Sequence, residues 1–226
     1  MLIFQTVALT IFYFMLVVEL LLLIPFIKKY KSLEKLSKFV FYYLIASIIF
    51  TGGSIICKYL NQNNMWLFSI MHYLQFLFIS LFYIEVIKSS LIKTIIKVVF
   101  IALLMIVLAD FFLIEGRYFF NSIAVTARNI IILIYGLVFF LQLVKDEDLV
   151  QEEIYINSLP SFWFNSGIFI YTCSSFMLCL SVNYIQNATP SEQENFLIVL
   201  GFSYIAGIVQ LLLFYFGLKQ TKKYGK

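Results

Sequence analysis

The sequence predicts an all-α integral membrane protein, a bundle of seven transmembrane helices with the N-terminus outside and the C-terminus in the cytoplasm. Of its 226 residues, 62% are hydrophobic and only 12% are charged, and this charged fraction is about half that of a soluble globular domain. Seven apolar stretches are each long enough to cross a hydrocarbon layer about 30 Å thick as a helix. They occupy nearly all of residues 1–226, which we therefore expect to form a single membrane domain.

The first three spans are predicted at residues 5–27, 39–57 and 66–87. The first has no basic residue before it, a lysine cluster after it and no small-residue cleavage pattern, so we expect a retained signal anchor. The second lies between that cluster and Lys58. Trp66 begins the third, at the depth where an indole ring is stable in the membrane interface.

The last four spans are predicted at residues 94–114, 118–144, 162–184 and 196–218. The fourth follows a short lysine-containing loop, and the fifth contains an arginine, Arg128. Trp163 lies at the start of the sixth, where it supports the boundary in the same way as the first tryptophan. The seventh is followed by a basic tail.

Basic residues are concentrated on one side of these spans. Only Lys58 and Arg117 fall in loops on the other side. Thirteen lie in the odd-numbered loops and the tail, namely Lys28, Lys29, Lys31, Lys35, Lys38, Lys88, Lys93, Lys97, Lys145, Lys219, Lys222, Lys223 and Lys226. The positive-inside rule places this side in the cytoplasm. Because the topology accounts for the formal net charge of +4, the charge gives no reason to expect a nucleic-acid partner.

Arg128 is the strongest functional candidate among the polar residues within the spans. A charge in the lipid costs about 2.5 kcal/mol or more on insertion scales, so such a residue usually faces the bundle interior and has a partner there. Counted from residue 118, Arg128 lies about 15 Å along the helix, near the membrane midplane. Asn121, Arg128, Tyr135 and Gln142 are spaced by seven residues and share one helical face, which we expect to point inward. Arg128 either serves ligand binding or gating, or only ties helices together.

Further ionisable and polar residues in the spans extend this hypothesis. Glu19 in the first span and Asp110 in the fourth are the candidate counter-charges of Arg128. His72 and Gln75, together with Asp110 and Asn121, are predicted to line an outward-facing pocket. A single membrane histidine is more often a packed, hydrogen-bonded group than a ligand-binding one.

A second polar set is predicted in the cytoplasmic half of the bundle. It consists of Glu19, Gln142, Asn165, Ser166 and Gln210. Such side chains commonly join helices at about 0.6 kcal/mol per pair, so structural contacts are the favoured interpretation for most of them.

Several classes of function are disfavoured by motifs that the sequence lacks. It has a single histidine and neither His-Glu-x-x-His nor Gly-x-Ser-x-Gly, so we expect no enzyme and no catalytic residue. The three cysteines form no Cys-x-x-Cys pair, and neither a metal site nor a cofactor is expected. Residues 196–218 contain no lysine for a retinal Schiff base, and no Pro-Gln pair of the kind found in seven-helix sugar transporters is present.

The segment Phe162-Trp163-Phe164-Asn165-Ser166-Gly167-Ile168-Phe169-Ile170-Tyr171, with Pro160 before it, resembles the sixth helix of small seven-helix membrane modules of Bacteroidetes-type bacteria. Similar modules occur alone or ahead of histidine kinase domains. The resemblance covers the topology and this one motif. It implies a sensory or signalling input module in the bacterial inner (cytoplasmic) membrane, and it names no ligand.

Three functions remain open at the level of the sequence. The first is a non-enzymatic sensory module that passes a ligand or membrane signal to a separate cytoplasmic or membrane partner, such as a histidine kinase. The second is a transporter of a small molecule or ion, and the third is a structural subunit of a larger membrane complex. The small residues Gly52, Gly53, Ser203 and Gly207 provide surfaces for close helix packing, either within the bundle or in a homo-oligomer.

Overall fold

Long helices make up almost all of the chain. The computed structural model describes residues 2–60, 63–146, 155–185 and 190–221, and these residues form helices and no strand. The long helices are α1 (Leu2–Lys29), α2 (Lys35–Tyr59), α3 (Met65–Val86), α4 (Ser90–Ala109), α5 (Ser122–Val144), α7 (Pro160–Ile185) and α8 (Pro190–Gln220). Short 3₁₀ turns lie at Tyr30–Ser32 and Ile156–Ser158, and a π-helical turn at Asp110–Ile114 ends α4.

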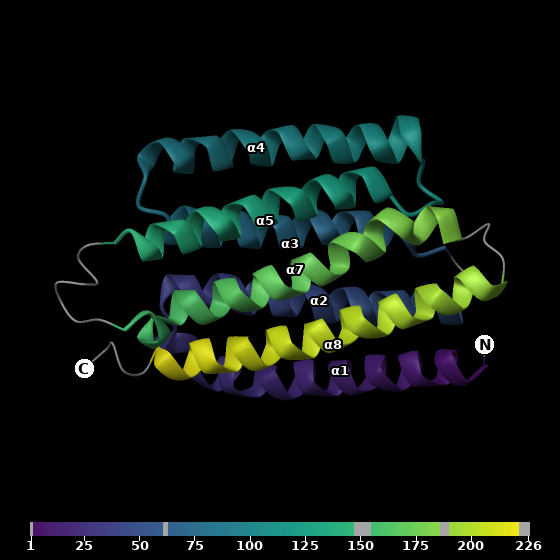
Figure 1. The fold of residues 1–226 in the computed structure, drawn as a ribbon, viewed down its shortest axis with the longest axis horizontal. Helices are drawn as coiled ribbons and strands as arrows, with labels where there is room; N and C mark the ends of the chain where they lie inside the picture. The colour runs from purple at the N-terminus through teal and green to yellow at the C-terminus, as the bar shows by residue number, and fades with distance from the viewer. Residues whose placement is uncertain (1, 61–62, 147–154, 186–189, 222–226) are drawn as a thin grey trace.

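Six of the described helices, α1 to α5 and α8, are long and apolar enough to cross a membrane. The chain is therefore a multi-pass membrane protein in contact with the lipid bilayer. The remaining helix, α7, has 26 residues and contains more serine, threonine and asparagine than the others. It runs between the same two ends of the bundle, beside α5 and α8 (Figure 1).

The helices are arranged as two layers with α4 at one edge (Figure 1). One layer contains α1, α2 and α3, and the other contains α8, α7 and α5. The layers are closed by contacts of α1 with α8 and of α3 with α5, while α4 packs against α3 and α5 from outside. The helices other than α4 thus form a closed ring in which neighbours follow the order of the chain. Side chains of both layers meet along the axis of this ring.

Apolar side chains cover both the interior and the outer surface. Phe26, Leu44, Phe76, Phe164 and Phe214 are fully buried between the helices. On the outward face of α4, by contrast, Leu91, Ile101 and Met105 are more than 60% exposed. A continuous apolar exterior of this kind is stable against lipid and would be an aggregation surface in water.

Close helix packing joins α7 and α8 through a reciprocal pair of Phe-x-x-Gly segments. A methyl group at Gly217 of α8 would lie 2.6 Å from the ring of Phe164 in α7, and one at Gly167 of α7 would lie 3.0 Å from the ring of Phe214 in α8. The two phenylalanine rings meet edge to face with centroids 5.9 Å apart. Each glycine therefore makes room for the aromatic ring of the opposite helix, as small residues do in membrane helix interfaces.

The start of α5 differs from the predicted span. The sequence predicts a span from residue 118, but α5 begins at Ser122, after a turn in which Gly116 has a φ of 86°. This left-handed backbone conformation suits glycine. Arg128 consequently lies only about 9 Å along α5 from its first residue. The predicted distance of about 15 Å is therefore too long, because the polar turn takes up the first residues of the hydrophobic stretch, while the position near the membrane midplane stays a prediction.

The basic residues of the described chain gather at one end of the bundle. α1, α3, α5 and α8 finish at this end, and α2 and α4 start there (Figure 1). Lys35 at the start of α2 forms an ion pair of 2.7 Å with Glu85 near the end of α3. This end is called the basic end below.

Candidate functional site

The guanidinium group of Arg128 is buried between α5 and α3. Its Nη2 donates to Gln75 Oε1 at 3.3 Å and its Nη1 donates to Asn129 Oδ1 at 3.1 Å. Arg128 is 5% exposed and Asn129 is 1% exposed. Both hydrogen-bond acceptors are neutral amides, so neither neutralises the charge of the arginine.

One cavity, here named the Arg128 cavity, includes Arg128 among its lining residues and has a volume of about 10 Å³. It is lined by Ser69, His72, Tyr73, Leu103, Val107, Asn121, Ala124, Val125 and Arg128. The imidazole ring of His72 is held edge-on to Phe120 and tilted against Phe68, with centroid distances of 6.3 and 5.7 Å. The cavity has about the space that one water molecule needs.

A second cavity, here named the Glu19 cavity, lies near the centre of the bundle and has a volume of about 40 Å³. It is lined by Met15, Glu19, Tyr43, Ser47, Gln75, Tyr171, Gly207, Gln210 and Leu211. Glu19 is 5% exposed, and its carboxyl group has the hydroxyl of Ser47 as a hydrogen-bonding neighbour. The cavity offers several oxygen and amide groups and has room for a few water molecules.

Gln75 connects the two cavities. It lines the Glu19 cavity and also accepts the hydrogen bond from Arg128. Tyr43 and Tyr171 line the Glu19 cavity together with Glu19 and Gln75. The structure therefore brings Arg128, Gln75 and Glu19 into one polar region, with neutral groups between the guanidinium and the carboxyl group.

The predicted ion pairs of Arg128 are not formed. Within the described residues, neither Glu19 nor Asp110 is in ion-pair contact with the guanidinium group. Glu19 belongs to the second cavity, beyond Gln75. Asp110 is fully buried, and its Oδ2 accepts a hydrogen bond from the backbone N–H of Ala124 at 2.9 Å. The pairing prediction is wrong because it rested on depth along the helices, whereas the rotation of each helix decides which side chains meet.

Asp110 instead caps the N-terminus of α5. Ala124 is in the first helical turn, where backbone N–H groups lack partners within the helix and the helix dipole favours a negative charge. Ser122 in the same turn donates to Glu115 Oε1 at 2.5 Å. Asp110 and Glu115 thus place two carboxyl groups at this terminus. Glu115 was not among the sequence candidates, because the sequence did not show that α5 starts at Ser122.

Asn121 and Ser69 join the same terminus to α3. The Ser69 hydroxyl and the Asn121 side-chain amide are 3.0 Å apart. With the amide nitrogen facing Ser69 and the carbonyl of Phe119, the amide oxygen accepts from the backbone N–H of Phe111 at 3.0 Å. Of the predicted outward-facing pocket, the structure brings His72 and Asn121 together in the Arg128 cavity and places Gln75 and Asp110 beside it.

The prediction of an inward-facing polar stripe on α5 is confirmed. Asn121, Arg128 and Tyr135 are 2%, 5% and 5% exposed. Tyr135 packs edge-on to the ring of Tyr83, with centroids 5.4 Å apart. Gln142, the last member, is half-buried and contacts the end of α3.

The predicted polar set of the cytoplasmic half does not form one cluster. Asn165 accepts a hydrogen bond of 2.7 Å from Tyr83, Ser166 donates to the carbonyl of Phe162 in its own helix, and Gln210 donates to Tyr43 at 3.4 Å. Glu19 and Gln210 share the Glu19 cavity, whereas the others lie elsewhere. These residues point to different neighbours because they lie on different faces of their helices.

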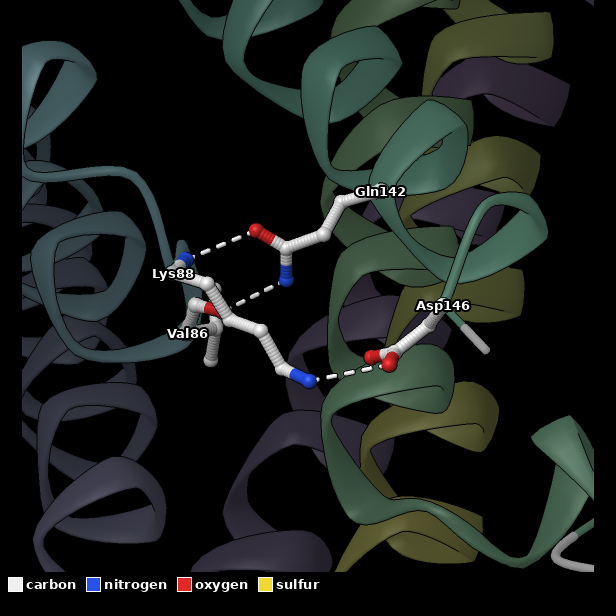
Figure 2. Close-up of polar contacts among 4 residues, drawn as sticks. All are labelled: Val86, Lys88, Gln142 and Asp146. Atoms are coloured by element: carbon white, nitrogen blue, oxygen red, sulfur yellow. Dashed lines mark hydrogen bonds and ion pairs between the residues drawn. The ribbon is translucent and has the colours of Figure 1, made fainter. Parts of the chain in front are cut away.

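Gln142 links α5 to the connection between α3 and α4. Its Oε1 accepts from the backbone N–H of Lys88 at 2.7 Å, and its Nε2 donates to the carbonyl of Val86 at 3.0 Å (Figure 2). Lys88 Nζ also forms an ion pair of 2.9 Å with Asp146, just beyond the end of α5. One glutamine thereby satisfies two backbone groups at the end of α3 that have no helical partner.

Replacing Gln142 by leucine is expected to loosen this end of the bundle. The change leaves the N–H of Lys88 and the carbonyl of Val86 without these partners, at a cost of about 1 kcal/mol in the free energy of unfolding. Thermal unfolding in mild detergent would show a lower melting temperature, with faster hydrogen exchange around residues 86–88. Leu141→Ala, on the adjacent 58% exposed position, is the control. Equal melting of Gln142→Leu and wild type would contradict the proposed link.

Several residues of the polar region were missed by sequence reasoning. Tyr43, Ser47, Tyr73 and Tyr171 line the two cavities, and Asn129 accepts a hydrogen bond from Arg128. Tyrosine and serine are common in membrane helices, so their presence alone is not informative. Asn129 follows Arg128 directly, and this unusual polar pair was the available signal.

The site combines charged and neutral polar groups in the interior of the bundle. It contains one buried cation, one buried carboxyl group and many neutral hydrogen-bonding groups. In the described part of the chain, no three His, Cys, Asp or Glu side chains gather closely enough to hold a metal ion. No protein-family model, curated protein or solved structure matches the chain.

Proposed function

We propose that the chain is a non-enzymatic sensory module of the bacterial inner membrane. In this proposal a small ligand binds at the polar region around Arg128, and the resulting change in helix packing is passed to a separate signalling partner, such as a histidine kinase. The resemblance of residues 160–171 to small seven-helix membrane modules is one support. The arrangement of Arg128 is the other, and it carries the proposal.

The supporting observation is a buried arginine that holds two helices together through neutral groups. Arg128 donates from α5 to Gln75 of α3, and both residues border cavities. Such a contact is weak enough to be exchanged for a contact with a ligand. A ligand changes the packing only if it binds two arrangements of the helices with different affinity, and the Arg128–Gln75 contact is where such a difference would arise.

The proposal includes seven membrane crossings with the basic end in the cytoplasm. The six apolar helices and α7 would each cross once. The described lysines at the helix termini support this orientation through the positive-inside rule. The acidic stretch of the sequence after α5 and the basic tail would be available to a partner on this side; they lie largely at residues 147–154 and 222–226, outside the described residues.

The path to the basic end would run through α3 and α5. The Arg128–Gln75 contact joins α3 and α5 in one half of the bundle, and Gln142 joins them again at the basic end. A displacement of α3 against α5 at Arg128 would therefore strain the Gln142 link. The α3–α4 connection and the chain after α5, which carries Asp146, would receive the change.

A transporter of a small molecule or ion is the second candidate, and the Glu19 cavity favours it. A buried carboxyl group lies between two three-helix layers, in a cavity lined by hydrogen-bonding groups from α1, α2, α3, α7 and α8. Secondary transporters place their sites near the midplane at the interface between two structural halves. Glu19 would then be the proton or substrate site.

The test is affinity purification of the full chain from its native cells in mild detergent, followed by mass spectrometry. We expect a histidine kinase or another signalling protein in near-stoichiometric amount. Arg128→Gln should alter that protein's activity in membrane vesicles several-fold, because it removes the cation from the Arg128–Gln75 contact. Lys97→Gln, at an exposed position of α4, is the matched control and should leave the activity unchanged.

Three outcomes would contradict the sensory function. A folded Arg128→Gln variant that leaves the partner's activity unchanged would remove Arg128 from the signal path. A solitary protein that moves solutes in proteoliposomes would establish the transporter, and Glu19→Gln should then abolish transport. Co-purification with a large envelope complex, and instability without it, would identify a structural subunit.

A further inference from the structure

A lysine-rich corner joins α1 to α2 at the basic end of the bundle. Residues 28–38 contain five lysines and one acidic residue, Glu34. They include the last residues of α1, the 3₁₀ turn at Tyr30–Ser32 and the first residues of α2. The corner therefore concentrates positive charge where the two helices reach the end of the apolar bundle (Figure 1).

Three lysines of this corner have no carboxylate partner. Lys35 is neutralised by its ion pair of 2.7 Å with Glu85 of α3. Within the described residues, Lys28, Lys31 and Lys38 form no such ion pair. These three are called the corner lysines below, and they leave a charge that an anion from outside the protein can neutralise.

Aromatic side chains hold the corner in place. Tyr30 packs against Phe41 of α2 with ring centroids 5.3 Å apart, and the ammonium group of Lys38 lies over the Tyr30 ring, 5.7 Å from its centroid. The hydroxyl oxygens of Tyr30 and Tyr42 are 2.8 Å apart and share one hydrogen bond. Each hydroxyl has one proton, so this tyrosine pair keeps one proton that it can donate to a further acceptor.

The surface that leads to the corner along α1 faces the lipid. Leu20, Ile24 and Ile27 are exposed, and their spacing of four and three residues places them on one face of the helix. They are called the α1 row below. Lys28 and Lys31 follow the end of this row, so a phospholipid lying along the row has its headgroup level with the corner lysines.

We propose that the α1–α2 corner binds the headgroup of an anionic phospholipid of the phosphatidylglycerol type. The phosphate accepts charge-assisted hydrogen bonds from the corner lysines and one further hydrogen bond from the tyrosine pair. An acyl chain of the same lipid lies against the α1 row. Basic sites beside membrane helices bind anionic headgroups in this way.

The position of the corner favours a lipid over a soluble anion. The α1 row is in contact with acyl chains in a bilayer, so headgroups are present beside the corner lysines at high local concentration. A free phosphate ion or an acidic peptide would have to be bound from solution, at the full entropic cost of association.

The lipid site is separate from the polar region around Arg128, because no residue of the corner lines either cavity. It is therefore independent of the proposed sensory function. A lipid bound there bridges the end of α1 and the start of α2, and it should stabilise the junction of these two helices.

The experiment measures thermal unfolding of the purified full chain in mild detergent with increasing amounts of phosphatidylglycerol or phosphatidylcholine. Both lipids carry the same acyl chains, so the comparison isolates the headgroup. We expect the melting temperature to rise with phosphatidylglycerol to a plateau and to rise much less with phosphatidylcholine. Native mass spectrometry should show phosphatidylglycerol retained on the chain in preference to phosphatidylcholine.

Two triple variants separate a specific site from general attraction between a basic protein and an anionic lipid. The corner variant is Lys28→Gln/Lys31→Gln/Lys38→Gln. It should raise the half-saturating concentration of phosphatidylglycerol about a hundredfold, since each lysine near an anionic surface contributes roughly fivefold in affinity. The control variant removes the same charge from α4 and the end of α5, and it should leave this concentration nearly unchanged; it is Lys93→Gln/Lys97→Gln/Lys145→Gln.

A milder variant tests the tyrosine pair. Tyr30→Phe combined with Tyr42→Phe removes both hydroxyl groups and keeps the aromatic rings and all lysines. It should raise the half-saturating concentration about tenfold, since a hydrogen bond to a charged group contributes about that factor or more. If the corner variant does not fold, this variant and native mass spectrometry of the wild type still decide the question.

Equal stabilisation of the wild type by the two lipids would overturn the lipid site. Equal losses in the corner variant and the control variant would do the same, because they would show attraction without a site. Stabilisation by sodium phosphate or by a poly-glutamate peptide as strong as that by phosphatidylglycerol would assign the corner to a soluble anion instead.

Discussion

Gly217→Leu is expected to prevent stable packing of α7 against α8. A methyl group at Gly217 would already lie 2.6 Å from the ring of Phe164, which is fully buried and cannot move aside freely. Overpacking a core by smaller amounts costs about 1–3 kcal/mol, so a leucine should cost about 3 kcal/mol or more. We expect little monodisperse protein on size exclusion in mild detergent and a melting temperature far below that of the wild type.

Gly201→Leu is the matched control, because it makes the same substitution in the same helix. No atom lies within 4 Å of a methyl group built at Gly201. The residue borders an apolar groove between α1 and α8, so a leucine there should be tolerated. If both variants behave alike, the reciprocal glycine and phenylalanine packing is not what holds α7 to α8.

A compensating substitution tests the same contact from the other side. Phe164→Ala alone leaves a cavity at a fully buried position and should cost about 3–5 kcal/mol. Combining it with Gly217→Leu fills part of that space. The double variant should therefore be more stable than either single variant, and a purely additive loss would contradict direct contact.

Asp110→Ala is expected to unravel the start of α5. Asp110 is fully buried, and its Oδ2 accepts from the backbone N–H of Ala124 at 2.9 Å. Removing an N-terminal cap costs about 0.5–2 kcal/mol, and here the loss should be at the upper end because the freed N–H is buried. Thermal unfolding should report the loss, and hydrogen exchange should place it in residues 122–126.

Asp110→Asn is the control for the cap, since its amide oxygen still accepts the hydrogen bond from Ala124 while the interaction of the charge with the helix dipole is lost. It should cost well under half as much as Asp110→Ala. A faster exchange spread evenly over the whole bundle, or none at residues 122–126, would show that Asp110 does not act as a local cap.

Helix α5 shows which structural features the sequence predicts and which it does not. Hydropathy and helical periodicity are local properties, so they predicted the helix up to Val144 and the burial of Asn121, Arg128 and Tyr135. They did not locate the first residue, since the turn with Gly116 and the cap by Asp110 are made with atoms outside the helix. The helix therefore starts at Ser122, and Arg128 lies nearer to its start than predicted.

The sequence by itself determined that this is a multi-pass, all-helical membrane protein, and it singled out Arg128, Glu19 and Asp110 as residues whose burial needs an explanation. The tertiary structure alone decided their partners. Arg128 meets Gln75, Asp110 caps α5, and Glu19 lies in its own cavity. The physical reason is that composition and spacing fix the depth and face of a residue within its own helix, whereas its partners depend on the order and rotation of the neighbouring helices.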